Sequence, residues 1–159
     1  MGRHDRLLPG LAALASVAGL GVSVYLTVVH YSAIPLVCTS SGAVNCERVL
    51  SSGYAVIAGS ALPTSAAGIV WFTVSAALAV GQLSGRGEPL LTLLQVAWSA
   101  LGLVTVLGLV FIEIVMLGTI CVWCTAAHAL VLATFLLAIA IWQSATESAR
   151  SMNTRPMRK

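Results

Sequence analysis

The chain alternates between long apolar runs and short polar breaks. Four runs reach the length of about 20 apolar residues that a helix needs to cross a bilayer, and they span 11–30, 62–83, 90–117 and 118–142. The third run is long enough to tilt in a membrane or to project beyond it. The pattern predicts an all-α integral membrane protein whose four transmembrane helices form a bundle.

The connections between these runs differ in length. Residues 31–61 form a long first loop, whereas 81–89 form a tight polar turn. Almost nothing separates the third run from the fourth, so we expect the chain to reverse near Gly118 and Thr119. No repeat or second polar region is visible, and residues 1–159 are interpreted as one membrane domain. The runs are rich in Ala, Gly and Ser, which allow helices to approach closely in lipid.

Composition and charge agree with a lipid environment. Hydrophobic residues make up 58% of the chain and charged residues 8%, against about a quarter charged in soluble domains. The net charge of +3 is concentrated at the termini and in one short loop, which indicates membrane topology rather than nucleic-acid binding.

The positive charges predict an orientation, because Lys and Arg favour cytoplasmic segments. With both termini cytoplasmic, seven of the eight basic residues lie inside and only Arg48 lies outside. The first loop and the junction before the fourth run then face the extracytoplasmic side, where disulfides can form. A cleavable signal peptide over 1–33 is disfavoured, because its apolar run exceeds the usual core of about 7–15 residues. The eight basic residues are Arg3, Arg6, Arg48, Arg86, Arg150, Arg155, Arg158 and Lys159.

Four cysteines fall into two clusters, Cys38 with Cys46 and Cys121 with Cys124. The second cluster is a C-x-x-C motif at the predicted start of a helix. This spacing lets the two sulfurs bond, and the helix end favours a thiolate. No His follows Cys124, so the motif does not match haem attachment.

The first cluster lies in the long loop, where the seven residues between Cys38 and Cys46 give little reason for rigidity. Asn45 is placed to cap a short helix that begins at Cys46, with Glu47 in its first turn. We expect this half-helix to lie over the bundle like a lid. The residues expected to rest on the membrane surface are Val49, Leu50, Tyr54 and Ile57.

Three interpretations of the cysteines compete. Both pairs could be static disulfides, or the four thiolates could bind zinc. The loose spacing of Cys38 and Cys46 and the lack of a second C-x-x-C knuckle argue against zinc. We favour a redox interpretation, in which a mobile loop pair exchanges disulfides with a pair at a membrane helix end.

These motifs together resemble the vitamin K epoxide reductase family, in its bacterial form. The two loop cysteines followed by Ser51-Ser52 resemble the family's first loop. The stretch Pro63-Thr64-Ser65-x2-Gly68 resembles the start of its second span, and Cys121-x2-Cys124 resembles its active-site motif. The resemblance covers roughly residues 38–132.

The resemblance implies a membrane thiol–disulfide oxidoreductase that supports disulfide-bond formation. Cys124 would face a membrane quinone (menaquinone, ubiquinone or vitamin K), with Cys121 as its disulfide partner. Cys46 would attack Cys121 and relay electrons from Cys38. Since the chain carries no fused thioredoxin domain, the reductant would be a separate extracytoplasmic thioredoxin-fold oxidoreductase of the disulfide-bond A type.

Four further residues are implied near the quinone. Thr64 stands where many members have Asn, and His128 stands where the vertebrate enzyme has Tyr; both positions are associated with hydrogen bonds to the quinone carbonyls. Ser52 matches a loop serine near the active site, and Trp123 is placed to shape the quinone mouth. The departures at Thr64 and His128 leave open which quinone is used and whether an epoxide is ever reduced.

Glu113 and the tryptophans within the spans have simpler interpretations. Glu113, eight residues before Cys121, can exchange protons with a quinone or extend to the surface, and we expect the second. Trp71 and Trp98 are expected to serve packing or interfacial anchoring. One alternative function is a convergent quinone-linked oxidase like the disulfide-bond B family, although the order of its cysteine pairs is the reverse. The other is a non-enzymatic metal-binding or scaffold membrane protein.

Overall fold

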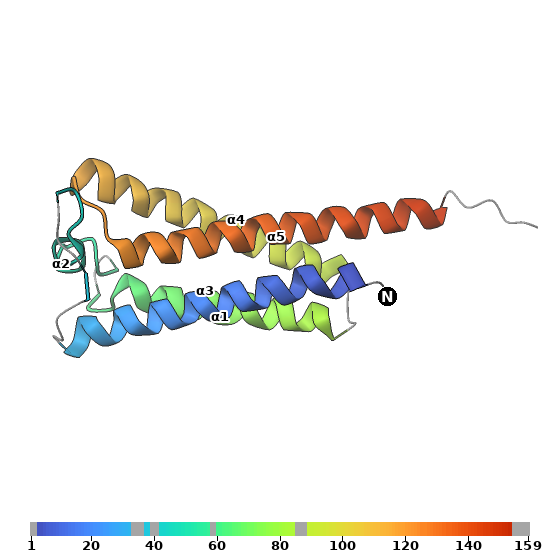
Figure 1. The fold of residues 1–159 in the computed structure, drawn as a ribbon, viewed down its shortest axis with the longest axis horizontal. Coiled ribbons are helices and arrows are strands. Elements are labelled where there is room, and N and C mark those ends of the chain that lie inside the picture. Colours follow the sequence, from blue (N-terminus) through green and yellow to red (C-terminus); the bar gives the residue numbers. More distant parts are fainter. Residues whose placement is uncertain (1–2, 33–36, 39–41, 58–59, 85–88, 154–159) are drawn as a thin grey trace, which may run out of the picture.

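Four long helices run side by side along one axis (Figure 1). The computed structural model describes residues 3–32, 37–38, 42–57, 60–84 and 89–153. The long helices are α1 (Arg3–Ser32), α3 (Thr64–Leu83), α4 (Pro89–Phe111) and α5 (Val122–Asn153). A five-residue π-helix, η1 (Ile112–Met116), continues α4, and the short helix α2 (Cys46–Leu50) lies across the same end of the bundle.

Each long helix contains a segment long and apolar enough to cross a membrane. In lipid a helix satisfies its own backbone hydrogen bonds, so a bundle of this kind is a stable way to span the bilayer. The chain is an all-α integral membrane bundle, as the hydropathy pattern predicts.

The helix ends differ from the predicted spans. Helix α1 begins at Arg3 rather than near residue 11, and α5 continues to Asn153 rather than ending near 142. Hydropathy marks the part of a helix that contacts lipid, and polar residues can extend a helix beyond it. The basic residues Arg86, Arg155, Arg158 and Lys159 lie outside the described residues.

The reversal expected near Gly118 is confirmed, but residues 118–121 are not part of a long helix. Gly118 has a φ of 61°, a left-handed conformation that glycine adopts readily. It ends the π-helix, and the N–H of Thr119 donates back to the carbonyl of Glu113 at 3.1 Å. The fourth span therefore starts at Val122 rather than at residue 118.

Small residues let the helices approach closely. Helix α1 lies against α3 and α5, and α4 lies against α5 and α3. The indole ring of Trp71 on α3 rests on Gly102 of α4. The Trp71 indole N–H donates to the carbonyl of Trp98 at 3.3 Å, and the Trp98 indole donates to the carbonyl of Trp71 at 3.2 Å. These two tryptophans therefore join α3 to α4, in line with the packing role expected for them.

Gly102→Ala should destabilise the bundle, because the added methyl group would overlap the Trp71 ring. Overpacking of this kind typically costs about 1–3 kcal/mol. Gly108→Ala is the matched control on the same helix, since nothing lies within 4 Å of its new methyl group. Thermal unfolding in detergent micelles should show a lower midpoint for the first variant alone. Equal midpoints for the two variants would contradict the close α3–α4 contact.

Candidate active site

Backbone hydrogen bonds fasten the first loop to the segment that precedes α5. The N–H of Asn45 donates to the carbonyl of Ile120 at 3.1 Å, and the N–H of Ile120 donates to the carbonyl of Ala43 at 2.9 Å. The Thr119 hydroxyl donates to the same Ala43 carbonyl at 3.0 Å. We call this set of bonds between 43–45 and 119–120 the loop clamp. It places Cys46, the next residue after Asn45, beside the C-x-x-C motif.

The short helix that carries Cys46 starts as predicted. The side chain of Asn45 accepts a hydrogen bond from the N–H of Arg48 at 2.9 Å, which caps α2. The expectation that Val49 rests on the membrane surface is wrong, because Val49 is buried against Cys46 and Cys121. The lid therefore turns an apolar face inward, onto the cysteines.

The two cysteine pairs differ in redox state and in exposure. Cys38 and Cys46 form a disulfide, whereas Cys121 and Cys124 are free thiols. Cys46 and Cys121 are 1% and 0% exposed and belong to the same buried cluster, while Cys38 is only half-buried. The loop pair is thus not uniformly mobile, since the clamp fixes its Cys46 end inside the protein. Within the described residues, no group of three or more His, Cys, Asp or Glu side chains is arranged to hold a metal ion.

The sulfur of Cys121 is the better site for a negative charge. Cys121 directly precedes α5, and its sulfur accepts the backbone N–H of Cys124 at 3.3 Å. The hydrogen bond from the Cys124 side chain is the main cause that lowers the pKa of the Cys121 thiol. Burial and the nearby Glu113 carboxylate oppose this shift without cancelling it. The helix start therefore favours a Cys121 thiolate paired with a Cys124 thiol.

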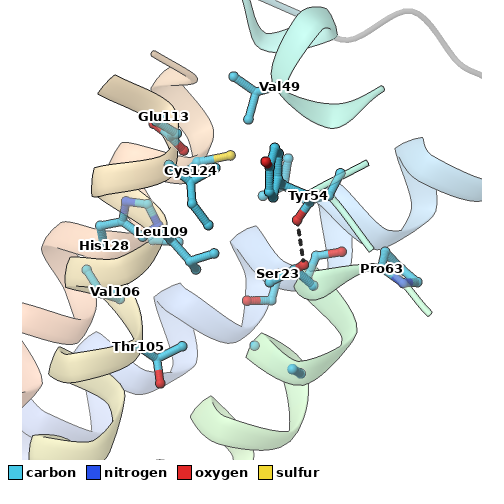
Figure 2. Close-up of a pocket in the computed structure, with 18 of the residues that line it drawn as sticks. Ser23, Val49, Tyr54, Pro63, Thr105, Val106, Leu109, Glu113, Cys124 and His128 are labelled. Atoms are coloured by element: carbon cyan, nitrogen blue, oxygen red, sulfur yellow. Dashed lines mark hydrogen bonds between the residues drawn. The ribbon is translucent and has the colours of Figure 1, made fainter. Parts of the chain in front are cut away.

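Glu113 lies in the π-helix and points into the protein. Only 5% of its surface is exposed, and its Oε2 atom lies 3.5 Å from the backbone nitrogen of Cys121. Its carboxyl group also interacts with the side chain of Cys124, and Figure 2 shows the two residues next to each other. The expectation that Glu113 extends to the surface is therefore wrong.

A cavity of about 340 Å³ opens beside Cys124, under the lid. Ligand pockets generally measure about 300–1,000 Å³ and combine an apolar wall with a few polar groups. Here the wall comes from all four long helices and from the loop after α2. In Figure 2, Glu113, Cys124 and His128 form one side, and Tyr54, Ser23 and Pro63 lie opposite.

His128 contributes a polar atom without a hydrogen-bond partner to this cavity. It lies one helical turn after Cys124, and its Nδ1 atom is buried without a hydrogen-bond partner. A buried polar atom without a partner is unfavourable, and a ligand oxygen in the cavity would satisfy it. His128 therefore lines the cavity, and its expected hydrogen bond to a quinone stays a prediction.

Thr64 and Ser52 also line the cavity, but their hydroxyl protons are used by the loop. The Thr64 hydroxyl donates to the carbonyl of Tyr54 at 3.4 Å, and the Ser52 hydroxyl donates to the carbonyl of Val49 at 2.7 Å. Both side chains thus hold the lid in place and offer a ligand only their acceptor lone pairs.

Trp123 does not line the cavity, which corrects its expected place at the mouth. Its indole N–H donates to the carbonyl of Val37 at 3.0 Å, and its ring lies 4.8 Å from that of Tyr25, between centroids. Trp123 therefore anchors the chain next to Cys38 to α1 and α5.

Sequence reasoning missed the polar side chains that α1 and α4 contribute. Ser23 and Thr105 line the cavity together with the loop residue Tyr54. The available signal was weak, because hydroxyl side chains in a helix often bond to their own backbone, as the Thr105 hydroxyl does to the carbonyl of Leu101. Glu113 carried a stronger signal, since an ionisable residue within a span is functional by default.

No curated protein sequence matches the chain significantly. The model of the vitamin K epoxide reductase family matches residues 11–139, which covers most of the chain and all four cysteines. The chain therefore belongs to the vitamin K epoxide reductase family of membrane thiol–disulfide oxidoreductases.

Proposed function

We propose that this protein oxidises an extracytoplasmic thiol partner and passes the electrons to a membrane quinone. The observation that carries the proposal is the order of four sulfurs: half-exposed Cys38, buried Cys46, buried Cys121, and Cys124 at the cavity. This order offers a path from the protein surface to an apolar cavity. Such a reaction would support disulfide-bond formation.

The partner would react at Cys38. A thiolate of a separate thioredoxin-fold oxidoreductase attacks the Cys38 sulfur and displaces Cys46, and the partner's second thiol then releases Cys38 and leaves as a disulfide. Val37 and Tyr31 are 79% and 61% exposed in this region and offer an apolar surface for such a partner. Two electrons and two protons now reside on Cys38 and Cys46.

The relay would continue through the buried pair. The Cys46 thiolate attacks Cys121 of an oxidised Cys121–Cys124 pair and releases Cys124. Cys38 then attacks Cys46, which restores the Cys38–Cys46 disulfide and leaves both motif cysteines reduced.

The cavity would hold the quinone ring, which accepts two electrons and two protons when bound. Its volume, its apolar wall and the unpaired Nδ1 atom of His128 suit a ring with carbonyl oxygens. Cys124 lines this cavity and would deliver the electrons, while Cys121 re-forms the disulfide with it. Menaquinone, ubiquinone and vitamin K all have the required carbonyl groups.

Charge placement supports an orientation for this reaction. Both termini would be cytoplasmic, because all basic residues except Arg48 then lie inside. The lid, the loop clamp and the four cysteines would face the extracytoplasmic side of a bacterial cell membrane. Secreted thiol proteins are found on that side.

Cys38→Ala should trap the exchange between the two pairs. Without Cys38, no thiol can complete the exchange by releasing Cys46, so the disulfide between Cys46 and Cys121 should accumulate once the motif has been oxidised. Mass spectrometry after alkylation of the free thiols would identify it. The Cys38→Ala/Cys121→Ala double variant is the control and should lack it. A disulfide between Cys46 and Cys124 would contradict the proposed order.

Cys124→Ala should stop electron delivery to the quinone. The protein should still accept electrons at Cys38–Cys46 from dithiothreitol, because the loop pair is unchanged. Quinol formation from decylubiquinone or menadione, followed by absorbance, should fall to the uncatalysed rate. Quinol production at the wild-type rate would refute the proposed function.

The first ionisation of the reduced motif should occur below the ordinary pKa of a thiol, because the Cys124 side chain stabilises the Cys121 thiolate. With Cys38 and Cys46 kept as a disulfide, thiolate absorbance near 240 nm reports the remaining two thiols. In Cys124→Ala the stabilising thiol is absent, so the midpoint should move to higher pH. An unchanged or lower midpoint would contradict this account of the Cys121 environment.

A further inference from the structure

Glu113 takes no part in the relay described above, although it lies at its last step. Among the five residues of η1, Ile114, Val115 and Met116 are 56–59% exposed, whereas Glu113 is 5% exposed. These three apolar side chains face outward, whereas Glu113 faces inward and lines the cavity together with Ile112. Among the described residues that line the cavity there is no Lys or Arg to form an ion pair with this buried acid.

The π-helix gives Glu113 its position. The N–H of Leu117 donates to the carbonyl of Ile112, five residues earlier, at 3.0 Å. A turn of this kind holds one more residue than an α-helical turn and changes the direction of the side chains around it; such turns are frequent at functional sites. Here the altered turn brings the Glu113 carboxyl group to the backbone N–H of Cys121 and to the side chain of Cys124.

With Cys121 as a thiolate and Cys124 as a thiol, the reduced motif carries one sulfur-bound proton that must be removed when the disulfide forms. The Cys121 sulfur accepts the N–H of Cys124 at the start of α5, so the negative charge is best placed there. Cys124 must then lose its own proton when it delivers electrons. Besides Glu113, the titratable groups around the cavity are His128 on the Cys124 helix, His30 on α1 and Tyr54 in the loop. Of these groups, Glu113 is the one that interacts with the Cys124 thiol.

We propose that Glu113 is the proton acceptor for Cys124 and transfers this proton to a quinone oxygen. The inference rests on the proposed function, since it needs a quinone as the acceptor. Glu113 would be a catalytic residue in the strict sense, because its carboxyl group lines the same cavity as Cys124 and interacts with the side chain that carries the reacting sulfur.

The step balances in electrons and protons. The Cys121 thiolate bonds to the Cys124 sulfur, the S–H bond of Cys124 breaks, and two electrons pass to the quinone. The Cys124 proton moves to the Glu113 carboxylate and then to one quinone oxygen, and a second proton from water goes to the other oxygen. The products are the Cys121–Cys124 disulfide and a quinol, and Glu113 returns to its carboxylate form.

Glu113→Gln tests the proposal, because glutamine keeps an oxygen for the Cys121 N–H but cannot take up a proton. The matched control is Glu47→Gln, which makes the same change at an exposed acid of α2 at the same end of the bundle. Single-turnover quinol formation from pre-reduced protein and decylubiquinone should slow by about 100-fold or more in Glu113→Gln alone. Reduction of the Cys38–Cys46 disulfide by dithiothreitol should keep its rate in both variants.

The alternative is that Glu113 only supports the start of α5. In that case Glu113→Gln would keep the wild-type rate, or would lose thermal stability and slow both half-reactions together; either result overturns the proposal. Glu113→Asp, which keeps a carboxyl group, should recover part of the quinone rate. The wild-type quinone step should also slow in deuterium oxide, and the absence of such an effect overturns the proposal even if Glu113→Gln fails to fold.

The Cys124→Ala variant distinguishes a failure of the role proposed for Glu113 from a failure of the proposed quinone-linked function. If Cys124→Ala abolishes quinol formation while Glu113→Gln does not affect it, the relay stands and the role of Glu113 is wrong. If both variants form quinol at the wild-type rate, the proposed function itself fails.

Discussion

The hydrogen bonds of the loop clamp organise the end of the bundle that carries the lid and the four cysteines. They join two segments that are about 75 residues apart in the chain, 43–45 and 119–120. Cys46 belongs to the first loop and Cys121 to the segment before α5, and these bonds hold the two segments against each other. With them, both sulfurs lie in one buried cluster, and the lid closes over the cavity. These few hydrogen bonds thus bring the two cysteine pairs together at one end of the bundle.

The four long helices pack closely along most of the bundle and enclose a cavity at the end covered by the lid. Around Gly102 the side chain of Trp71 fills the space between α3 and α4. Nearer the lid the helices enclose the cavity. The polar groups that line this cavity come from different elements: Glu113 from η1, His128 from α5 and Thr64 from α3. Such a site is specified by how the helices are placed rather than by any one of them.

The sequence predicted the parts that depend on local pattern. Four apolar runs, the cap at Asn45 and the reversal at Gly118 follow from hydropathy, side-chain chemistry and glycine conformation. Hydropathy could not reveal that Val49 faces inward, because lipid and the protein interior both accept valine. Nor could it reveal the π-turn that directs Glu113 inward, since one additional residue in a turn leaves no mark on composition. The position of Trp123 depends on Tyr25 of α1, about 100 residues away, and no local pattern records that contact.

The burial of Cys46 and Cys121 also limits unwanted disulfide exchange with small thiols from the medium. A small thiol in the surrounding medium reaches Cys38, the half-exposed end of the path, but not the two sulfurs in its middle. In the proposed relay, electrons would therefore enter at Cys38 and leave at Cys124, while the packing around Cys46 and Cys121 keeps small thiols of the medium away from these two sulfurs. The apolar face of α2, through Val49, thus shields the Cys46 and Cys121 sulfurs from thiols in the medium.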